Sequence, residues 1–143
     1  MPKLDSKQLR LLKKKAKEIG KKYRLDFIIL YGSKIKDTPP GPETDIDLGI
    51  YRRRQGIGVK EYLAIRQEFQ ALFPQEDIDL KRLHHLNPLF RFQAVYRGKL
   101  LYGDPLQFEE FKAYAYRSFI DALPLLKLEK KLVKKFQKEL LND

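Results

Sequence analysis

Cysteine is absent from this chain, and its absence removes disulfides, thiolate metal sites and cysteine nucleophiles together. No apolar run approaches the roughly 18 residues that a membrane-spanning helix needs. The N-terminus is charged and lacks the hydrophobic core of a signal peptide. Together these absences favour a cytoplasmic protein with no membrane partner.

Acidic residues are outnumbered by basic ones, with 19 Asp and Glu against 30 Lys and Arg and a net charge of +11. The excess predicts a polyanionic partner: a nucleotide, RNA or an acidic protein. The alternative is a lysine-rich, well-solvated surface. The length of 143 residues predicts a single domain with a core of its own. Abundant Lys and Glu with a single Met are also a compositional hint of a thermophilic source.

Hydrophobic periodicity predicts alternating helices and strands, and therefore an α/β domain with helices packed against one sheet. Asp5 and Gln8 have the spacing of a capping box at the first helix. Pro124 is expected to break or kink the last helix. The expected helices are 1–23, 59–73, 89–96 and the chain from 105 onward, and the expected strands are 25–31, 45–51, 76–82 and 99–102.

The stretch from Phe27 to Ile50 organises the chain. Its first part, 27–31, is a continuous apolar run typical of a strand covered on both faces. Gly32 follows, and a residue without a side chain lets a phosphate approach the backbone. The next amides and the Ser33 hydroxyl would then bond phosphate oxygens, especially at a helix start within 33–36. The proline-rich segment 37–42 cannot continue a helix, and we expect an exposed loop over the site.

The second half of this stretch places two carboxylates on one strand. Asp45 and Asp47 alternate with aliphatic residues, so both carboxylates share one face. At a separation of about 4 Å and an effective dielectric near 20, their repulsion costs roughly 4 kcal/mol. Mg²⁺ would relieve it, because this ion prefers carboxylate oxygens together with substrate phosphates. A phosphate-binding segment that faces two metal-binding aspartates indicates nucleotidyl transfer.

Gly-Ser followed, after residues 34–44, by Asp-hydrophobic-Asp resembles the signature of the nucleotidyltransferase superfamily, which has the polymerase-beta-like fold. The short length and the segment RFQAVYRGKLLYGDP resemble the minimal nucleotidyltransferases, and among them the MntA-type antitoxins of the HEPN/MNT toxin–antitoxin system. The resemblance covers about residues 25–140. It implies an α/β (α+β) nucleotidyltransferase fold, a small mixed β-sheet with helices packed on it. The catalytic core would be 1–103 and a C-terminal helical extension 104–143.

The resemblance also implies which residues form the site. Two Mg²⁺ ions would be held by three carboxylates, and the triphosphate of ATP by the segment after the first strand. The third carboxylate comes from the strand 76–82, where Asp77 is the alternative to Asp79. The implied metal ligands and catalytic residues are Asp45, Asp47 and Asp79, and the implied nucleotide contacts are Gly32, Ser33 and Lys34.

The function implied is transfer of AMP from ATP to a tyrosine of a HEPN-domain RNase toxin, which would make the protein an antitoxin. A first alternative is a non-catalytic module that neutralises its partner by occlusion through the helices at 105–141. A second is a nucleotidyltransferase acting on RNA or a small molecule. Arg52–Arg54 would be phosphate or RNA contacts, or a solvated turn. His84 and His85 are more typical of a loop pair than of a metal site. Homo- and hetero-oligomers both remain open.

Overall fold

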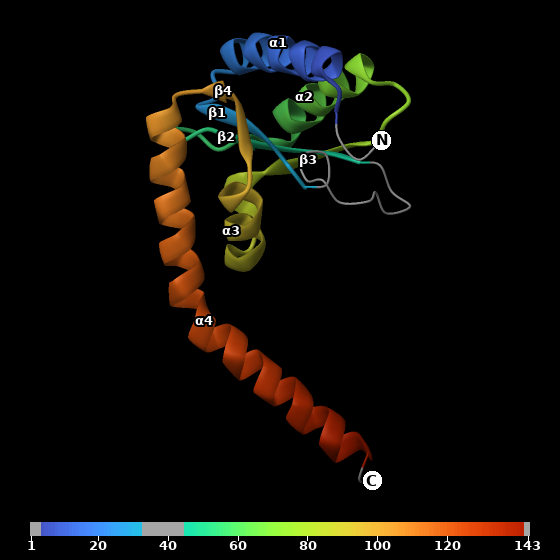
Figure 1. The fold of residues 1–143 in the computed structure, drawn as a ribbon. Helices are drawn as coiled ribbons and strands as arrows, with labels where there is room; N and C mark the ends of the chain where they lie inside the picture. The colour runs from blue at the N-terminus through green and yellow to red at the C-terminus, as the bar shows by residue number, and fades with distance from the viewer. Residues whose placement is uncertain (1–3, 33–44, 142–143) are drawn as a thin grey trace.

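The structure, a computed structural model, describes residues 4–32 and 45–141. In these ranges it forms a four-stranded sheet with helices on both faces (Figure 1). The strand order is β3-β2-β1-β4. β1 pairs antiparallel with β2 and β4, whereas β2 and β3 are parallel. The elements are α1 Ser6–Lys22, β1 Phe27–Tyr31, β2 Ile46–Tyr51, α2 Val59–Leu72, β3 Ile78–Arg82, η2 Leu83–His85, α3 Pro88–Tyr96, β4 Lys99–Gly103 and α4 Pro105–Leu141. The mixed sheet confirms the predicted α/β nucleotidyltransferase-like fold.

Local sequence signals explain most of the element boundaries. The Gln8 amide donates to the Asp5 carboxylate at 2.7 Å and the Gln8 side chain accepts from the Asp5 amide at 3.1 Å, so the predicted capping box is confirmed. The helix accordingly begins at Ser6 rather than near residue 1. The segment 99–102 forms the expected edge strand beside β1. The helical turn predicted at 33–36 and the loop predicted at 37–42 lie outside the described residues.

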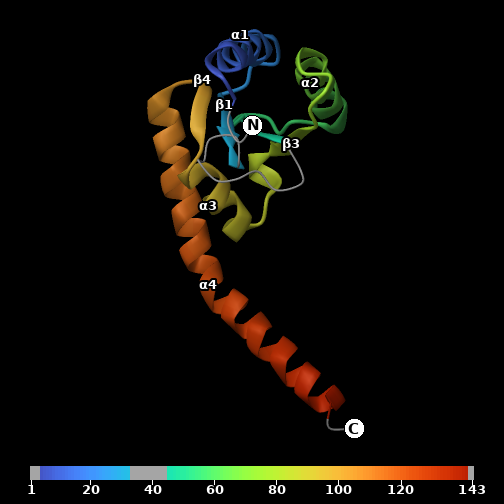
Figure 2. The ribbon, with the colours of Figure 1, turned by 45° about the vertical axis from the view of Figure 1, so that its right-hand side comes forward.

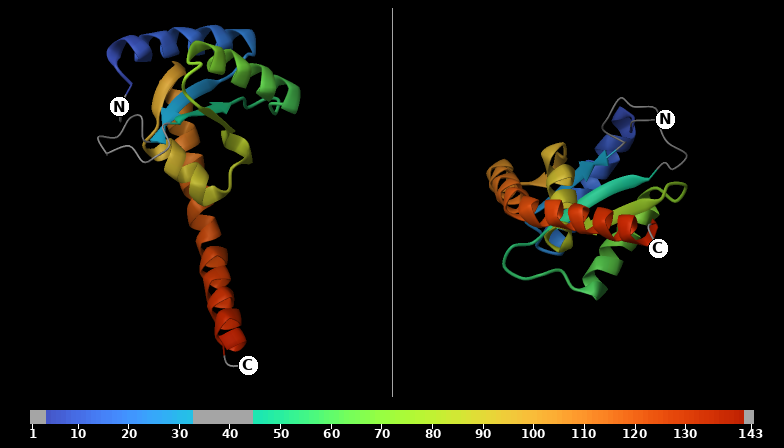
Figure 3. Two further views of the ribbon diagram at one scale, coloured as in Figure 1. Left: turned by 90° about the vertical axis from the view of Figure 1, so that its right-hand side faces the viewer. Right: turned by 90° about the horizontal axis from the view of Figure 1, so that it is seen from below.

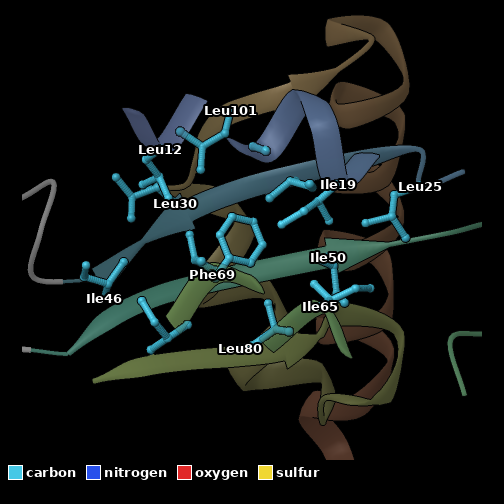
Figure 4. Close-up of a cluster of buried hydrophobic side chains, with 14 of the residues drawn as sticks. Leu12, Ile19, Leu25, Leu30, Ile46, Ile50, Ile65, Phe69, Leu80 and Leu101 are labelled. Atoms are coloured by element: carbon cyan, nitrogen blue, oxygen red, sulfur yellow. The ribbon is translucent and has the colours of Figure 1, made fainter. Parts of the chain in front are cut away.

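The two faces of the sheet have different roles. α1 and α2 cover one face, and α3 and α4 lie on the other (Figures 1 and 2). Because strand side chains alternate, Ile28 and Leu30 enter the core under α1 and α2 (Figure 4). Phe27, Ile29 and Tyr31 point to the α3 and α4 side. The α1 and α2 face carries an apolar core. Polar groups can therefore lie at one end of the α3 and α4 face without weakening that core.

Of the break or kink predicted at Pro124, the structure has the kink, because α4 is one continuous helix with Pro124 inside it. Figure 1 shows this helix changing direction partway along, as a proline inside a helix requires. Its first half packs on the body through Phe108, Phe111 and Ala115, and its second half projects away from the sheet (Figure 3). Among the described residues, no helix combines the length and the hydrophobicity that crossing a bilayer requires.

A buried arginine ties α3 to the end of β3. Arg91 is 7% exposed, and its donors are met by oxygen atoms of three neighbouring segments. It donates to the carbonyls of Leu83 at 3.0 Å, His84 at 3.0 Å and Leu86 at 2.7 Å, and to the Tyr114 hydroxyl at 3.3 Å. Buried polar groups are tolerated when they are hydrogen-bonded in this way. Arg91 therefore fixes the position of α3 relative to the sheet.

We predict that Arg91→Met lowers the free energy of unfolding by about 3 kcal/mol, because the buried carbonyls lose their donor. Urea denaturation measures the change. The control is Arg66→Met on the exposed side of α2, where we expect less than about 0.5 kcal/mol. Equal effects of the two substitutions would show that Arg91 is not a structural tie.

Candidate active site

The sheet register brings three polar side chains from three strands into one row. Tyr31 lies opposite Asp47 in the antiparallel pair β1–β2, and Asp47 lies opposite Asp79 in the parallel pair β2–β3. Register partners on neighbouring strands point to the same face. The row is therefore on the α3 side of the sheet, where β1 ends and β2 and β3 begin. We call Asp47 and Asp79 the carboxylate pair.

The other two aspartates predicted from the sequence lie beside this pair. Asp45 directly precedes β2, is half-buried, and its charge acts on the carboxyl of Asp47. Asp77 directly precedes β3 and its side chain is exposed, while its carbonyl accepts from the Ile46 amide at 2.8 Å. The structure thus places Asp79, rather than Asp77, opposite Asp47. The register therefore pairs Asp79 with Asp47, and which of the two aspartates is the third carboxylate stays a prediction.

Negative charge is crowded at the carboxylate pair. Burial, the charge of Asp79, a hydrogen bond with Asp79 and the charge of Asp45, in that order of importance, together raise the pKa of Asp47 to about 6. Lys81 opposes this shift, and its Nζ lies 3.5 Å from Oδ1 of Asp79. Among the described residues, the Lys81 ammonium offsets only part of the negative charge of the carboxylate pair.

The hydroxyl of Tyr31 is buried next to these carboxylates. The side chain is 7% exposed, and the hydroxyl has no hydrogen-bond partner among the described residues. Burial, together with the charges of Asp47 and Asp79, holds the pKa of the Tyr31 hydroxyl well above its usual value. The hydroxyl therefore stays protonated, as a donor at the edge of the site.

Gly32 makes room for the Asp47 carboxylate. Its φ of 82° lies in the left-handed region, which favours glycine. A Cβ at this position would collide with a carboxylate oxygen of Asp47 and lie 3.0 Å from its Cγ. A side chain at residue 32 would therefore displace the Asp47 carboxylate. Ser33 and Lys34, the other predicted nucleotide contacts, lie outside the described residues.

The residues present fit a divalent cation. Asp47 and Asp79 supply hard oxygen donors in register, and their crowding is relieved by positive charge. Within residues 4–32 and 45–141, no three acidic or histidine side chains are already gathered around one ion position. Mg²⁺ does not require such a cage, because it commonly binds one or two carboxylates and completes its shell with water and substrate phosphates.

A cavity of about 260 Å³ opens beside the carboxylate pair. Tyr31, Gly32 and Asp47 form one wall, and the α3 side chains of Phe90, Gln93 and Arg97 form another. Sequence analysis missed the α3 wall. Gln93 and Arg97 have the four-residue spacing of one helix face, which was a usable signal. Their apposition to Asp47, however, depends on how α3 packs against the sheet.

Larger hollows, of about 330 and 540 Å³, lie at the opposite end of β2 near Arg53. Asp47 lines neither of them, so the smaller cavity is the candidate site. The predicted phosphate contact Arg52 is already engaged, because its guanidinium meets both Glu61 oxygens at 2.7 and 2.8 Å. It also donates to backbone carbonyls of the following turn and of residue 23. Arg52 is thus a structural residue, although it lines the 540 Å³ hollow together with Arg53 and Arg54.

The family model described as "Polymerase beta, Nucleotidyltransferase" matches residues 14–105. The chain belongs to this nucleotidyltransferase family. The matched segment contains the whole sheet and every residue of the carboxylate row, and ends where α4 begins. No curated protein sequence matches the chain.

Solved structures of toxin–antitoxin complexes share the fold. A chain of a toxin–antitoxin complex with AMP-PNP is 20% identical with a TM-score of 0.66, over 88% of this chain and 98% of that one. A chain of an MntA–HepT complex is 19% identical with a TM-score of 0.64, over 90% and 98%. A third structure holds a tri-AMPylated HEPN toxin of Shewanella oneidensis with its MNT antitoxin. The matching chain is 19% identical with a TM-score of 0.63, over 91% and 98%.

We predict that Asp79→Asn stabilises the metal-free protein at pH 8 by about 1 kcal/mol, because it removes the charge that opposes ionised Asp47. A carboxyl with a raised pKa in the folded state favours folding below its unfolded pKa near 4, and this advantage is lost as the pH rises through about 6. The gain from Asp79→Asn should therefore shrink as the pH falls from 6 to 4.

Urea denaturation in EDTA at several pH values measures this dependence. The control is Asp77→Asn, where the exposed side chain predicts no change at any of these pH values. The half-exposed ion pair between Lys81 and Asp79 contributes little to stability in water. Its loss in Asp79→Asn therefore does not turn the expected stabilisation into a destabilisation. Loss of stability in Asp79→Asn at pH 8 would contradict the crowding.

Proposed function

We propose that this protein is an antitoxin and a Mg²⁺-dependent nucleotidyltransferase that transfers AMP from ATP to a tyrosine of a HEPN-domain toxin. The observation that carries the proposal is the carboxylate pair, of which Asp47 lines a cavity, in a chain of the polymerase beta nucleotidyltransferase family. Structurally similar complexes contain AMP-PNP in one case and a tri-AMPylated HEPN toxin in another, which supports both the nucleotide and the acceptor.

The proposed reaction is attack of the tyrosine oxygen on the α-phosphorus of ATP. A new oxygen–phosphorus bond forms, and the bond from the α-phosphorus to the bridging oxygen of the β-phosphate breaks. Pyrophosphate leaves with that electron pair, and the phenolic proton passes to a base. Bound Mg²⁺ supplies positive charge that stabilises the phosphate oxygens in this reaction.

The carboxylates divide the remaining tasks. Asp45 and Asp47 are the proposed ligands of the cations, of which two are expected. Asp79 is the proposed third carboxylate, as a metal ligand or as the base that takes the proton from the acceptor hydroxyl. Gly32, Ser33 and Lys34 are the proposed contacts of the triphosphate.

The cavity beside Asp47 is the proposed position of the nucleotide. Arg97, exposed at the end of α3, offers a guanidinium that suits the phosphate groups. Phe90 is 41% exposed and offers an aromatic face to a base. The volume of about 260 Å³ accommodates part of a nucleotide, with the remainder extending into solvent.

We predict that Arg97→Met weakens binding of Mg²⁺ and AMP-PNP about 10-fold, since one charge-assisted contact is lost. Calorimetric titration measures the affinity. Arg117→Met, on the exposed surface of α4, is the matched control and should bind as the wild type does. An unchanged affinity in Arg97→Met would place the nucleotide elsewhere.

The main test is transfer itself. The protein is incubated with α-labelled ATP, Mg²⁺ and the HEPN-domain protein of the same genome, and the products are analysed by intact mass. We expect one or more AMP units on the HEPN protein, and a loss of rate of at least about 100-fold in Asp47→Asn, which removes a proposed metal ligand.

Asp77→Asn is the matched control for this experiment, because it removes an equal charge from an exposed site beside the same strands, and its rate should stay within about twofold. Full activity in Asp47→Asn would contradict the proposed mechanism. A stable complex without any transfer would favour neutralisation by occlusion instead.

A further inference from the structure

The second half of α4 is an amphipathic helix whose apolar side is uncovered. The last buried residue of α4 is Ala115, and every residue from 127 to 141 is exposed. Five large apolar side chains here, 43–76% exposed, recur at three- and four-residue spacing and so lie along one side of the helix. We call this set the tail stripe: Leu125, Leu128, Leu132, Phe136 and Leu140.

Lysines occupy the opposite side of the same helix. At 100° per residue, Lys127, Lys134 and Lys138 lie directly across from the tail stripe, with Lys130 and Lys131 beside them. The lysine side is therefore already suited to water, whereas the tail stripe gains free energy only by being covered. A contiguous exposed apolar patch of this kind marks an interaction surface.

We infer that the tail stripe docks the HEPN-domain protein that accepts AMP, in an apolar groove on its surface. This inference rests on the proposed function for the identity of the partner. The family match ends at residue 105, so the tail lies outside the matched nucleotidyltransferase segment. The tail extends on the α3 side of the sheet, the side that also holds the carboxylate pair (Figures 1 and 3). A protein bound there is held on the same side as the site, which raises its local concentration.

The spacing of the stripe disfavours a second copy of this chain. A two-stranded coiled coil requires apolar residues at alternating three- and four-residue steps, and after Leu132 these steps fall on Lys135 and Glu139. The stripe instead continues in steps of four through Phe136 and Leu140. Such a ridge packs across the groove of another helical surface at a steep angle. The net charge of +11 on each copy also opposes self-association.

Two carboxylates interrupt the apolar side and specify the partner further. Glu129 and Glu139 fall within the angular range of the tail stripe, and neither makes an ion pair among the described residues. Carboxylates on the apolar side disfavour burial in an anionic lipid surface, which a basic amphipathic helix otherwise favours. They suit a groove that presents cationic side chains opposite them, on a protein whose overall charge complements this basic chain.

Two double variants test the surface. Leu132→Asp with Phe136→Asp disrupts the tail stripe, and Lys134→Ala with Lys138→Ala alters the opposite side. Both lower the net charge equally, so long-range attraction to an acidic partner changes by the same amount. All four side chains are exposed, which leaves the fold of the body intact.

Calorimetric titration with the HEPN-domain protein of the same genome should show an affinity loss of about 100-fold for the stripe variant and less than about threefold for the lysine variant. Equal losses, an unchanged stripe variant, or no binding by the wild-type chain would each overturn the docking surface. The wild-type chain alone should be monomeric by light scattering, and a dimer that the stripe variant abolishes would assign the stripe to a second copy.

The remaining alternative is that the tail stripe binds a membrane surface, and sedimentation with phosphatidylglycerol vesicles tests it. Binding to vesicles that the stripe variant abolishes would assign the tail to a membrane surface. The proposed docking surface and the proposed reaction can be contradicted separately. The stripe variant should still bind Mg²⁺ and AMP-PNP, and Asp47→Asn should still bind the HEPN protein. Stripe-dependent binding without AMP transfer would remove the proposed reaction and leave the docking surface standing.

Discussion

The repulsion between Asp47 and Asp79 is the constraint on which the candidate site depends. Parallel strands hold the two carboxylates in register, and partial burial together with the charge of Asp79 raises the pKa of Asp47 to about 6. Lys81 offsets part of this charge. A sheet that only had to fold would place apolar or well-separated polar side chains here. This crowding is the observation that motivates the proposed binding of a cation and the phosphates that accompany it.

The fold tolerates this local cost because the other face of the sheet is fully apolar. The core beneath α1 and α2 includes Phe69 and fixes the strands independently of the polar row (Figure 4). Two further features keep the site open. Gly32 leaves space for the Asp47 carboxylate, and Arg91 anchors α3 so that its side chains form the cavity wall. Stability and site geometry thus come from different layers of the molecule.

Local patterns predicted much of this structure, and long-range packing accounts for what they missed. The capping box at Asp5, the buried strand after it and the paired aspartates are each encoded within a few residues. The position of Asp79 opposite Asp47 depends on the β2–β3 register, and the cavity wall on α3 depends on tertiary packing. Hydrophobic periodicity predicted the last helix, but periodicity cannot tell whether the apolar side of a helix is covered. Pro124 bends that helix without ending it.

The central claim is that the carboxylate pair binds nucleotide through a divalent cation. Its most direct test is calorimetric titration of AMP-PNP into the wild-type protein and Asp47→Asn, each with Mg²⁺ and with EDTA. We predict that Mg²⁺ tightens binding at least about 10-fold in the wild type and leaves Asp47→Asn unchanged. Equal affinity of the wild type in Mg²⁺ and EDTA would contradict the account.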